Sequence, residues 1–537
     1  MEVDIQFSDS WNEAWKKDQR QQATWEQFQL AYEATNWTSI PTFDGLLCKQ
    51  HLPQLDIYPH QERTAKRVIE EMDGKAILAD EVGLGKTIEA GLILKEYMVR
   101  GLVNKALILV PATLVRQWVK ELNEKFHIPA VEQKKSYVWK AHPIVVGSID
   151  TAKRPPHRDI VLQQSYDMII FDEAHRLKNA KTKNYQFARS LERKFCLMLT
   201  ATPVQNHPGE LYHLVHLLKP GLLGSYKEFR TLFEQGGEKA VKHMVEKVMV
   251  RHRREETGFQ WTKRRVSSIY LDFTKEEREL YNLLFSLKED ATLKGLTMTT
   301  LLKEACSSKE AVYLTLKNLY EENVITEDVF TRIISAVEKV KENTKAEKAL
   351  EIIASTSEEE KVVLFTEYKA TQLYLQWYFA QHGISSVPFR GGFKRSKKEW
   401  MQQLFQTKAK VLIATEAGGE GINLQFSNII INYDLPWNPM RLEQRIGRLH
   451  RLGQKKDVQI YHFAVNETIE EHILSLLYEK IALFENVIGQ LDTILSSTSV
   501  MSVEKYIHNV LETSHSKKEM ALKMKQLTYA LEQGGRE

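Results

Sequence analysis

Cysteine is scarce in this sequence, and long apolar runs are absent. The three cysteines, Cys48, Cys196 and Cys306, stand far apart without paired spacing, so neither a disulfide framework nor a zinc site is indicated. No segment approaches the roughly 20 apolar residues that cross a bilayer. The acidic N-terminus, MEVDIQFSDS, lacks the basic and apolar parts of a signal peptide. We therefore expect a cytoplasmic protein with no membrane partner.

Net charge is also small. The 74 lysines and arginines stand against 70 acidic residues, which leaves +4. Overall charge therefore does not indicate a nucleic-acid partner, and local clusters must carry that argument. The hydrophobic share of 43% and the charged share of 27% are typical of a globular protein. A chain of 537 residues is long enough for two or three domains.

Short apolar strands alternate with helical stretches from about residue 75 onward. This alternation predicts an α/β fold with parallel sheets wrapped by helices. A first set of expected strands covers 76–80, 106–110, 143–147, 168–172 and 196–200. A second set covers 362–366, 411–415, 428–434 and 458–463. The sequence therefore predicts two α/β lobes.

The regions outside the two lobes are expected to be helical. Trp11 and Trp15 stand one helical turn apart near the N-terminus, which favours a helical arm packed on the core. Residues from about 205 to 345 lose the strand signal. The expected division is an N-terminal helical arm at 1–50, a first lobe at 51–250, a helical insertion and linker at 251–345, a second lobe at 346–480 and a helical tail at 481–537.

A glycine-containing loop, DEVGLGKT at 80–87, follows the first expected strand and precedes a helical segment. Such a loop presents backbone N–H groups and the positive end of the helix to phosphate oxygens. Lys86 would contact the β- and γ-phosphates, and Thr87 would ligate magnesium. Asp80 stands where the strict pattern has glycine. A loop that merely turns the chain is the alternative.

An acidic pair, Asp172 and Glu173, ends the apolar run MIIF. Two carboxylates at the end of a buried strand are costly unless they have a function. Asp172 could hold magnesium through its waters, and Glu173 could orient and deprotonate an attacking water. A solvated helix start is the alternative. Upstream, the amide of Gln61 could bind adenine, although a capped helix start explains that segment equally well.

The segment EQRIGRLHRLGQ at 443–454 carries Arg445, Arg448 and Arg451 at intervals of three residues. On a helix these arginines would lie on one face. Guanidinium groups aimed at a γ-phosphate stabilise the charge of phosphoryl transfer, as arginine fingers do. A solvated basic face is the alternative. Because this cluster and Lys86 lie in different lobes, lobe closure would complete a site.

Taken in order, these motifs resemble helicase superfamily two, and specifically its Swi/Snf-type branch of ATP-driven DNA translocases. The resemblance spans residues from about 55 to 480 and implies two RecA-like lobes. It rests on DEVGLGKTIEAG (80–91), LVPATLVRQW (109–118), DEAHRLKN (172–179), LTATPVQN (199–206), VLFTEY (363–368), TEAGGEGINLQ (415–425) and YDLPWNPMRLEQRIGRLHRLGQ (433–454). The first and last motifs are similar to bacterial members related to the RNA-polymerase-associated recycling ATPase. That resemblance also accounts for Asp80.

The resemblance implies a role for individual residues. ATP binding is expected at Gln61, Gly83, Gly85, Lys86, Thr87 and Gln444. Catalysis is expected at Lys86, Asp172, Glu173, Arg448 and Arg451, with magnesium on Thr87 and Asp172. Coupling of nucleotide state to the bound strand is expected at Thr200, Thr202 and Gln205. The nucleic-acid path is expected at Thr113, Arg116, Gln117, Thr415, Gly418, Asn423, Trp437 and Asn438.

Three functions remain open from the sequence. The first is a double-stranded DNA translocase that displaces bound protein, with RNA polymerase or another DNA-bound complex as partner. Its candidate phosphate contacts are the basic stretches 251–254, 263–265 and 394–398. The second is a strand-separating RNA or DNA helicase, because Asp-Glu-Ala-His also labels an RNA-unwinding group. The third is an ATP-dependent switch or scaffold that docks on a partner complex.

Overall fold

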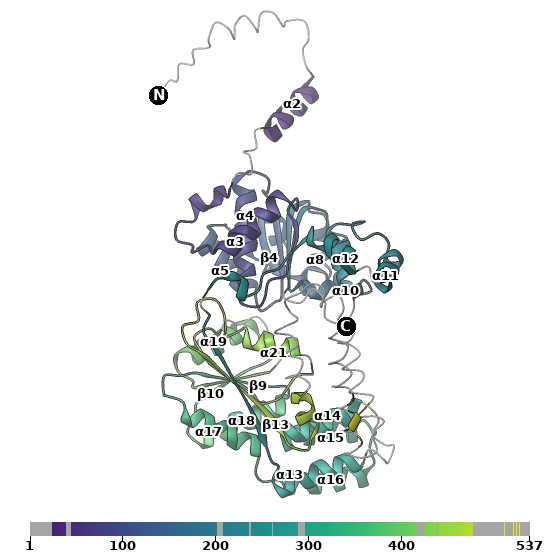
Figure 1. The fold of residues 1–537 in the computed structure, drawn as a ribbon, viewed down its shortest axis with the longest axis vertical. Helices are drawn as coiled ribbons and strands as arrows, with labels where there is room; N and C mark the ends of the chain where they lie inside the picture. The colour runs from purple at the N-terminus through teal and green to yellow at the C-terminus, as the bar shows by residue number, and fades with distance from the viewer. Residues whose placement is uncertain are drawn as a thin grey trace, which may run out of the picture.

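The strands of the protein form two parallel sheets within the part of the chain that the structure describes. The structure is a computed structural model, and Figure 1 shows its two lobes, one above the other. It describes residues 24–38, 45–200, 208–235, 238–259, 261–287, 296–415, 424–437 and 439–475, with Val510, Glu519, Leu522, Lys523 and Gln526. The predicted α/β fold with two parallel-sheet lobes is confirmed.

The first sheet has the order β3-β4-β2-β5-β6-β1-β7. Its strands are β1 (Lys75–Leu78), β2 (Ala106–Val110), β3 (Val131–Glu132), β4 (Ile144–Ser148), β5 (Tyr166–Asp172), β6 (Arg193–Leu199) and β7 (Met249–Val250). Its helices are α3 (Pro59–Glu70), α4 (Lys86–Val99), α5 (Val115–Phe126), α6 (Val138–Ala141), α7 (Ile149–Ala152), α8 (His157–Leu162), α9 (Lys183–Arg189), α10 (Pro208–Leu218), α11 (Tyr226–Glu234) and α12 (Glu238–Glu246). Ile108 and Leu109 enter separate apolar clusters because successive strand side chains point to opposite faces. Helices thus bury both faces of the sheet.

The second sheet has the order β10-β11-β9-β12-β13-β8. Its strands are β8 (Arg264–Leu271), β9 (Val362–Thr366), β10 (Ser386–Phe389), β11 (Val411–Thr415), β12 (Ile429–Asn432) and β13 (Val458–Val465). Nearby helices are α17 (Thr344–Ser355), α18 (Lys369–Gln381), α19 (Arg395–Thr407) and α21 (Pro439–Ile446). Val363 and Leu364 enter separate apolar clusters, so this sheet is also buried on both faces.

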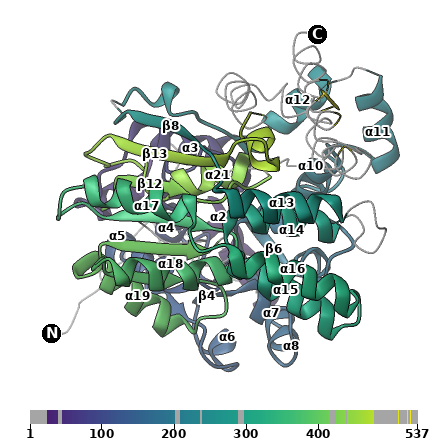
Figure 2. The ribbon, with the colours of Figure 1, turned by 90° about the horizontal axis from the view of Figure 1, so that it is seen from below.

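A group of helices packs beside the second sheet, as Figure 2 shows. It consists of α13 (Lys275–Ser286), α14 (Leu296–Ser307), α15 (Lys309–Glu321) and α16 (Glu327–Lys339). Their buried side chains form one apolar cluster with Leu435 and Val465, which belong to the second lobe. Among the described residues, no helix is both long and apolar enough to traverse a bilayer.

The expectation that residues 205–345 contain no strand is wrong at β7 and β8. Strand β8 lies at the edge of the second sheet, where Leu271 pairs with Val465 of β13. Val266 is 45% exposed and Tyr270 is 48% exposed, so β8 lacks the continuous apolar run by which a buried strand is recognised. A segment of the predicted linker therefore belongs to the second sheet.

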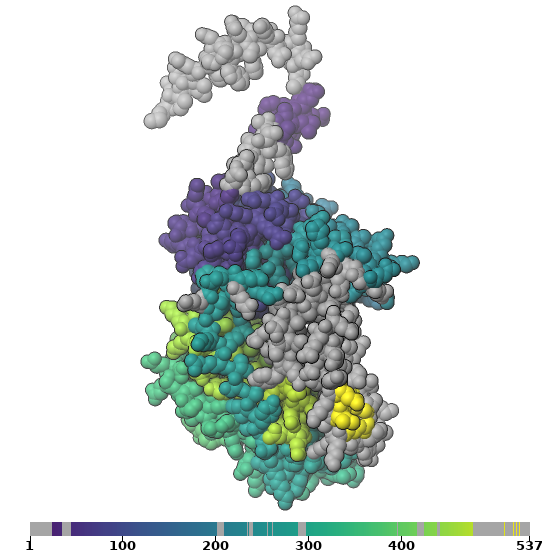
Figure 3. Space-filling view, viewed as in Figure 1, coloured from purple at the N-terminus to yellow at the C-terminus, as the bar shows by residue number. Residues whose placement is uncertain are grey.

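The N-terminal helix α2 (Trp25–Thr38) stands away from the first lobe, as Figures 1 and 3 show. The prediction that the arm packs on the core is wrong for this helix. Trp25 is 74% exposed and Tyr32 is 60% exposed. Their rings stack on Phe28 between them, at centroid distances of 5.5 and 6.4 Å. Trp25, Phe28 and Tyr32 therefore contact one another rather than the lobe. Trp11 and Trp15 lie outside the described residues.

Candidate functional site

A cavity of about 430 Å³ lies between the carboxyl edge of the first sheet and the second lobe. The residues predicted for ATP binding and catalysis all line it: Gln61, Gly83, Gly85, Lys86, Thr87, Asp172, Glu173, Gln444, Arg448 and Arg451. Thr200, predicted for coupling, lines it as well. The structure thus brings segments separated by more than 350 residues of sequence into one site, about as large as typical small-ligand pockets.

The loop between β1 and α4 forms the floor of the cavity. Gly85 precedes α4 with a φ of 95°, and a Cβ atom there would lie 2.5 Å from Nε2 of Gln61. The Gln61 amide donates to the Leu84 carbonyl (3.1 Å) and accepts from the Tyr58 backbone N–H (3.2 Å). Gln61 therefore caps α3 and holds the loop. The capped helix start that the sequence left open is present.

Lys86 directs its ammonium group across this loop. Its Nζ atom donates to the backbone carbonyls of Asp80 (2.5 Å) and Glu81 (3.1 Å). Desolvation lowers the pKa of the Lys86 ammonium, and the negative charges of Asp80 and Glu173 oppose that change. The loop therefore offers a cation and the N-terminus of α4 at one place, which is the arrangement that binds phosphate.

Asp172 and Glu173 follow the end of β5, where they meet opposite environments. Asp172 accepts hydrogen bonds from the Trp118 indole and from the Glu173 backbone N–H, each 2.9 Å long. Desolvation and the neighbouring Glu173 charge raise the pKa of Asp172 to about 6. Desolvation acts in the same direction on Glu173, but His175, whose Nδ1 lies 3.2 Å away, and Arg448 outweigh it and lower the pKa to about 2. Glu173 is therefore ionised at neutral pH.

The arginines of the second lobe do not share one helix face, so that prediction is wrong. Helix α21 ends at Ile446, before Arg448 and Arg451. Arg445 is buried, and its guanidinium donates to the Asp434 carbonyl (2.9 Å) and to Asn432 (3.3 Å). Arg448 and Arg451 instead line the cavity. The regular spacing therefore does not give the three arginines one role: Arg445 binds within the second lobe, and Arg448 and Arg451 line the cavity.

The phosphate loop packs directly against the segment that carries Arg448 and Arg451. A Cβ atom on Gly447 would lie 2.4 Å from Cγ1 of Val82, and one on Gly83 would lie 3.2 Å from the His450 carbonyl oxygen. The Leu452 backbone N–H donates to the Gly83 carbonyl at 3.3 Å. A side chain at position 447 would therefore clash with Val82, and one at position 83 would crowd the His450 backbone from a φ of 96°, which favours glycine.

The basic stretch 251–254 is also part of this contact, so the prediction of a DNA phosphate contact is wrong for Arg254. Arg254 donates to the carbonyls of Val82 (2.7 Å) and His450 (3.3 Å). The His252 backbone N–H donates to the Asp80 carboxylate at 2.8 Å. In the stretch 263–265, Arg264 donates to both carboxylate oxygens of Glu443. Arg254 and Arg264 thus connect protein segments, whereas Arg265 is exposed and pairs with Asp457.

Helix α5 contributes cavity residues that the sequence analysis did not assign: Leu114 at its N-terminus, then Trp118, Glu121 and Lys125. Their spacing is that of one helix face, which was the available signal. Gln425 of the second lobe and Leu55 and Tyr58 of the first also line the cavity. Trp118 and Gln425 are the last residues of the motifs 109–118 and 415–425. The sequence around them does not indicate that the Trp118 side chain points toward Asp172 or that the Gln425 side chain points into the cavity.

A second cleft of about 1210 Å³ contains part of the predicted nucleic-acid path. Thr113, Arg116 and Gln117 line it from the first lobe, and Phe393, Lys398 and Glu399 line it from the second. Arg116 pairs with Glu132 (3.3 Å) and with Glu399 across the cleft. Lys398 thus places one residue of the basic stretch 394–398 in this cleft.

Other predicted nucleic-acid residues lie elsewhere. Thr415 is buried at the end of β11. Trp437 packs near the helices beside the second sheet, with the Lys303 ammonium 4.9 Å from its ring. Neither residue lines the second cleft as described. The remaining predicted positions, Thr202, Gln205, Gly418, Asn423 and Asn438, lie outside the described residues.

The phosphate loop, the acidic pair and two arginines from an opposing parallel-sheet lobe define a helicase-like nucleotide hydrolase. The family model described as SNF2-related domain matches residues 60–332, and that described as helicase conserved C-terminal domain matches residues 344–453. The chain therefore belongs to the SNF2-related, helicase-like family, and it is an ATP hydrolase. The resemblance to the Swi/Snf-type branch of superfamily two is confirmed.

Individual relatives agree with this assignment. YqhH of Bacillus subtilis, named as an uncharacterized ATP-dependent helicase, is 55% identical over 94% of this chain and 93% of its own length. The RNA polymerase-associated protein RapA of Pectobacterium carotovorum is 26% identical over 84% of this chain, which spans 52% of RapA. The Hef helicase domain of Pyrococcus furiosus is 18% identical, covers 80% of this chain and 99% of its own, and has a TM-score of 0.50, which supports the fold alone.

We predict that Trp118→Phe makes ATP hydrolysis more sensitive to acid. The Trp118 hydrogen bond lowers the pKa of Asp172, so its loss moves that pKa further above about 6. A carboxyl group with a raised pKa is ionised at high pH and loses its charge as pH falls. The acid limb of the kcat/KM profile, which reports groups of the free enzyme, should therefore move up by about one pH unit, with little change near about pH 8.

The matched control is Trp139→Phe. Trp139 is buried in the same lobe, and its indole donates to His157 at 2.9 Å, remote from Asp172. Its pH profile should match that of the unmodified protein. Equal profiles for Trp118→Phe and the unmodified protein would contradict the assigned effect of Trp118 on Asp172.

Proposed function

We propose that this ATP hydrolase is a translocase on double-stranded DNA that remodels or displaces DNA-bound protein without separating the strands. The observation that carries the proposal is the division of one cavity between two lobes. Lys86, Asp172 and Glu173 belong to the first lobe, whereas Arg448 and Arg451 belong to the second. ATP in this cavity contacts both lobes, so its binding and hydrolysis change how strongly the lobes are held together.

The residues of the cavity fit this substrate. Lys86 and the N-terminus of α4 hold the phosphates, and the ionised Glu173 orients the attacking water and accepts its proton. Thr87 and Asp172 provide oxygen ligands for magnesium, which supplies positive charge to the phosphate oxygens when it is bound. Arg448 and Arg451 reach the phosphate from the other side and stabilise the charge that develops during transfer.

We predict that Arg448→Ala and Arg451→Ala each reduce turnover far more than ATP affinity. A finger arginine acts on charge that develops in the transition state, so its loss lowers kcat by about a thousandfold or more. Steady-state ATPase measurements and a nucleotide-binding titration separate the two quantities. Arg254→Ala, which removes a nearby arginine that donates to the Val82 and His450 carbonyls and is not among the residues lining the cavity, is the control for altered lobe packing. A change confined to the KM for ATP would contradict the finger role.

The second cleft is the proposed place for DNA. Thr113, Arg116 and Lys398 offer hydroxyl and cationic groups to phosphates from both lobes. Gln117 lines this cleft and the ATP cavity as well, so α5 directly joins the two sites. The similarity to RapA supports RNA polymerase, or another DNA-bound complex, as the protein that the motor acts upon. Thr200 and the neighbouring Thr202 and Gln205 are proposed to couple nucleotide state to the DNA.

We predict that Glu399→Gln increases affinity for duplex DNA by about two- to fivefold. A DNA phosphate that binds Arg116 must replace Glu399, which pairs with Arg116 across the cleft. Fluorescence anisotropy with a labelled duplex measures the affinity. Glu124→Gln is the control, because it removes the same charge from the same cleft while Glu124 pairs with Lys120 instead. An equal increase in both variants would show a general charge effect and contradict the specific competition at Arg116.

Two measurements test the proposed function. The first is which nucleic acid stimulates ATP hydrolysis, and the second is whether the protein displaces a third strand or unwinds a fork. Double-stranded DNA should stimulate the ATPase, with little dependence on base sequence, and stimulation should fall steeply between about 50 and 200 mM salt. The protein should remove the third strand of a DNA triplex when ATP is present and leave a forked duplex annealed. Lys86→Ala is the control without hydrolysis. Efficient fork unwinding, or stimulation by RNA but not by duplex DNA, would reject the proposal in favour of a helicase.

A further inference from the structure

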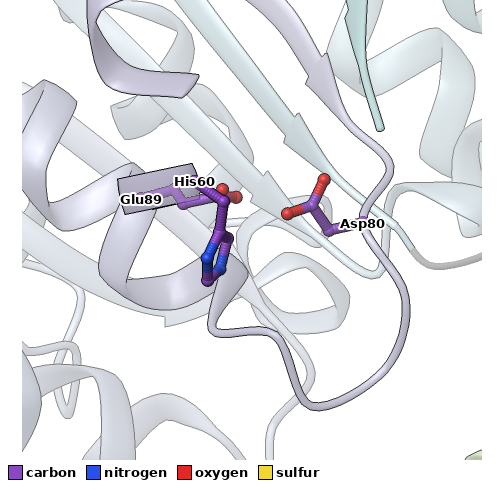
Figure 4. Close-up of side chains that lie close together, drawn as sticks. All are labelled: His60, Asp80 and Glu89. Carbon is purple, nitrogen blue, oxygen red and sulfur yellow. The ribbon is translucent and has the colours of Figure 1, made fainter. Parts of the chain in front are cut away.

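A buried polar cluster lies beneath the phosphate loop, outside the set of residues described as lining the ATP cavity. It consists of His60 on α3, Asp80 after β1 and Glu89 on α4, which are 1%, 0% and 0% exposed. One ligand atom from each residue lies within 4.8 Å of the others. Figure 4 shows the carboxyl groups of Asp80 and Glu89 pointing toward each other beside the His60 ring.

Hydrogen bonding within the described structure is incomplete at two residues of this cluster, Glu89 and His60. Among the described residues, neither carboxylate oxygen of Glu89 has a hydrogen-bond partner, and His60 Nδ1 has none either. Unpaired polar groups at such depth are costly. His252 is the nearest basic side chain on Asp80, with its Nδ1 atom 3.2 and 3.4 Å from the two carboxylate oxygens. Two adjacent carboxyl groups therefore face histidine nitrogens in a closed space.

The tautomer of His60 follows from its contact with the loop. Its Nε2 atom lies 3.1 Å from the Leu84 carbonyl oxygen, which can only accept, so Nε2 carries the proton. The lone pair is then on Nδ1, the atom without a partner among the described residues. Metal-binding histidines usually show this arrangement, in which the second ring nitrogen donates to a carbonyl or carboxylate.

We propose that His60, Asp80 and Glu89, together with His252, bind a divalent transition-metal ion of the zinc class beneath the phosphate loop. Two imidazole nitrogens and two carboxylate oxygens suit a tetrahedral zinc site. Ligand atoms on such an ion lie about 3.4 Å apart, given bonds of about 2.1 Å. The ligand atoms, which lie within 4.8 Å of one another in this structure, therefore draw together on binding. The nitrogen ligands distinguish this site from the oxygen ligands that magnesium prefers with ATP.

The ion would act on the loop through two existing contacts. His60 holds the Leu84 carbonyl, and the carbonyl of Asp80 accepts from the Lys86 ammonium. An ion bound to both side chains fixes the backbone before Gly83 and between Gly83 and Gly85. The site is therefore structural, with all four ligands from protein. The bound ion stabilises the conformation of the loop and takes no part in ATP hydrolysis, which occurs in the cavity.

Zinc binding by the full chain tests the proposal directly. The protein is stripped with a chelator and dialysed against zinc in excess magnesium and without nucleotide, and the bound metal is measured by elemental analysis. We expect one equivalent of tightly bound zinc and an increase in Tm, because a ligand that binds only the folded state stabilises it. Cobalt(II) in place of zinc should give the visible absorption of a tetrahedral ion, a readout that depends on no variant.

Variants locate the ion. Glu89→Gln should lose the equivalent of zinc and the zinc-dependent increase in Tm. His252→Gln should weaken binding, and because His252 is partly exposed this variant keeps a folded protein for comparison. Glu304→Gln is the matched control: Glu304 is buried on α14, one of its oxygens lacks a partner among the described residues, and burial raises its pKa to about 8. It should retain the zinc.

Two results would overturn the proposal. The first is an unmodified protein that takes up no tight zinc and gives no tetrahedral cobalt spectrum. Asp80 and Glu89 would then share a proton instead of a metal ion. The second is retention of the same equivalent by both Glu89→Gln and His252→Gln, which would place the ion elsewhere in the chain. Neither result depends on ATP hydrolysis, so the proposal stands or fails independently of the proposed function.

Discussion

Parallel pairing of the strands is the constraint on which the site depends. Neighbouring strands of each described sheet run in the same direction, so their carboxyl ends meet at one edge. The loop after β1 carries Lys86, and β5 ends at Asp172 beside it. Loops at such an edge can expose backbone N–H groups and side chains without leaving them buried and unpaired. The helices around the sheet bury its faces and thereby hold this edge in place.

Two adjacent carboxyl groups at this edge have different pKa values because their neighbouring groups differ. Asp172 and Glu173 are consecutive, yet desolvation raises the pKa of the first to about 6, and cationic neighbours lower that of the second to about 2. The second lobe contributes to this difference through Arg448. His175 of the first lobe contributes most to the lowered pKa of Glu173, and Arg448 of the second lobe adds to it. The approach of the second lobe therefore strengthens a difference that the first lobe already establishes.

Local pattern predicted the features that depend on local chain chemistry. The apolar runs 106–110 and 362–366 are strands, and the glycine loop before Lys86 has the expected form. Features that depend on distant partners were missed or misread. Arg445 and Arg254 stand in basic sequence segments that suggest an exposed charged surface, but they donate hydrogen bonds to backbone carbonyls inside the protein. Strand β8 owes its conformation to pairing with β13, because its own exposed side chains do not favour burial.

The helix α2 and the indole of Trp118 are two further cases in which the sequence pattern did not predict the contacts of a side chain. Aromatic residues at helical spacing are typical of a face packed on a core, yet Trp25, Phe28 and Tyr32 of α2 contact one another in solvent. Trp118 looks like an ordinary core residue, and it is 1% exposed. Its one polar atom nevertheless reaches Asp172. Hydrophobicity predicts where a side chain is buried, whereas a single hydrogen bond from it depends on the whole fold.

The close approach of Val82 and Gly83 to Gly447 and His450 has a consequence for sequence change. Side chains in contact across an interface do not contribute independently to stability. A larger residue at 447 is tolerated only if position 82 becomes smaller, although the two positions lie in different lobes. Substitutions in the phosphate loop and in the arginine segment will therefore be non-additive. A substitution in one lobe at these contact positions is therefore expected to require a compensating substitution in the other lobe.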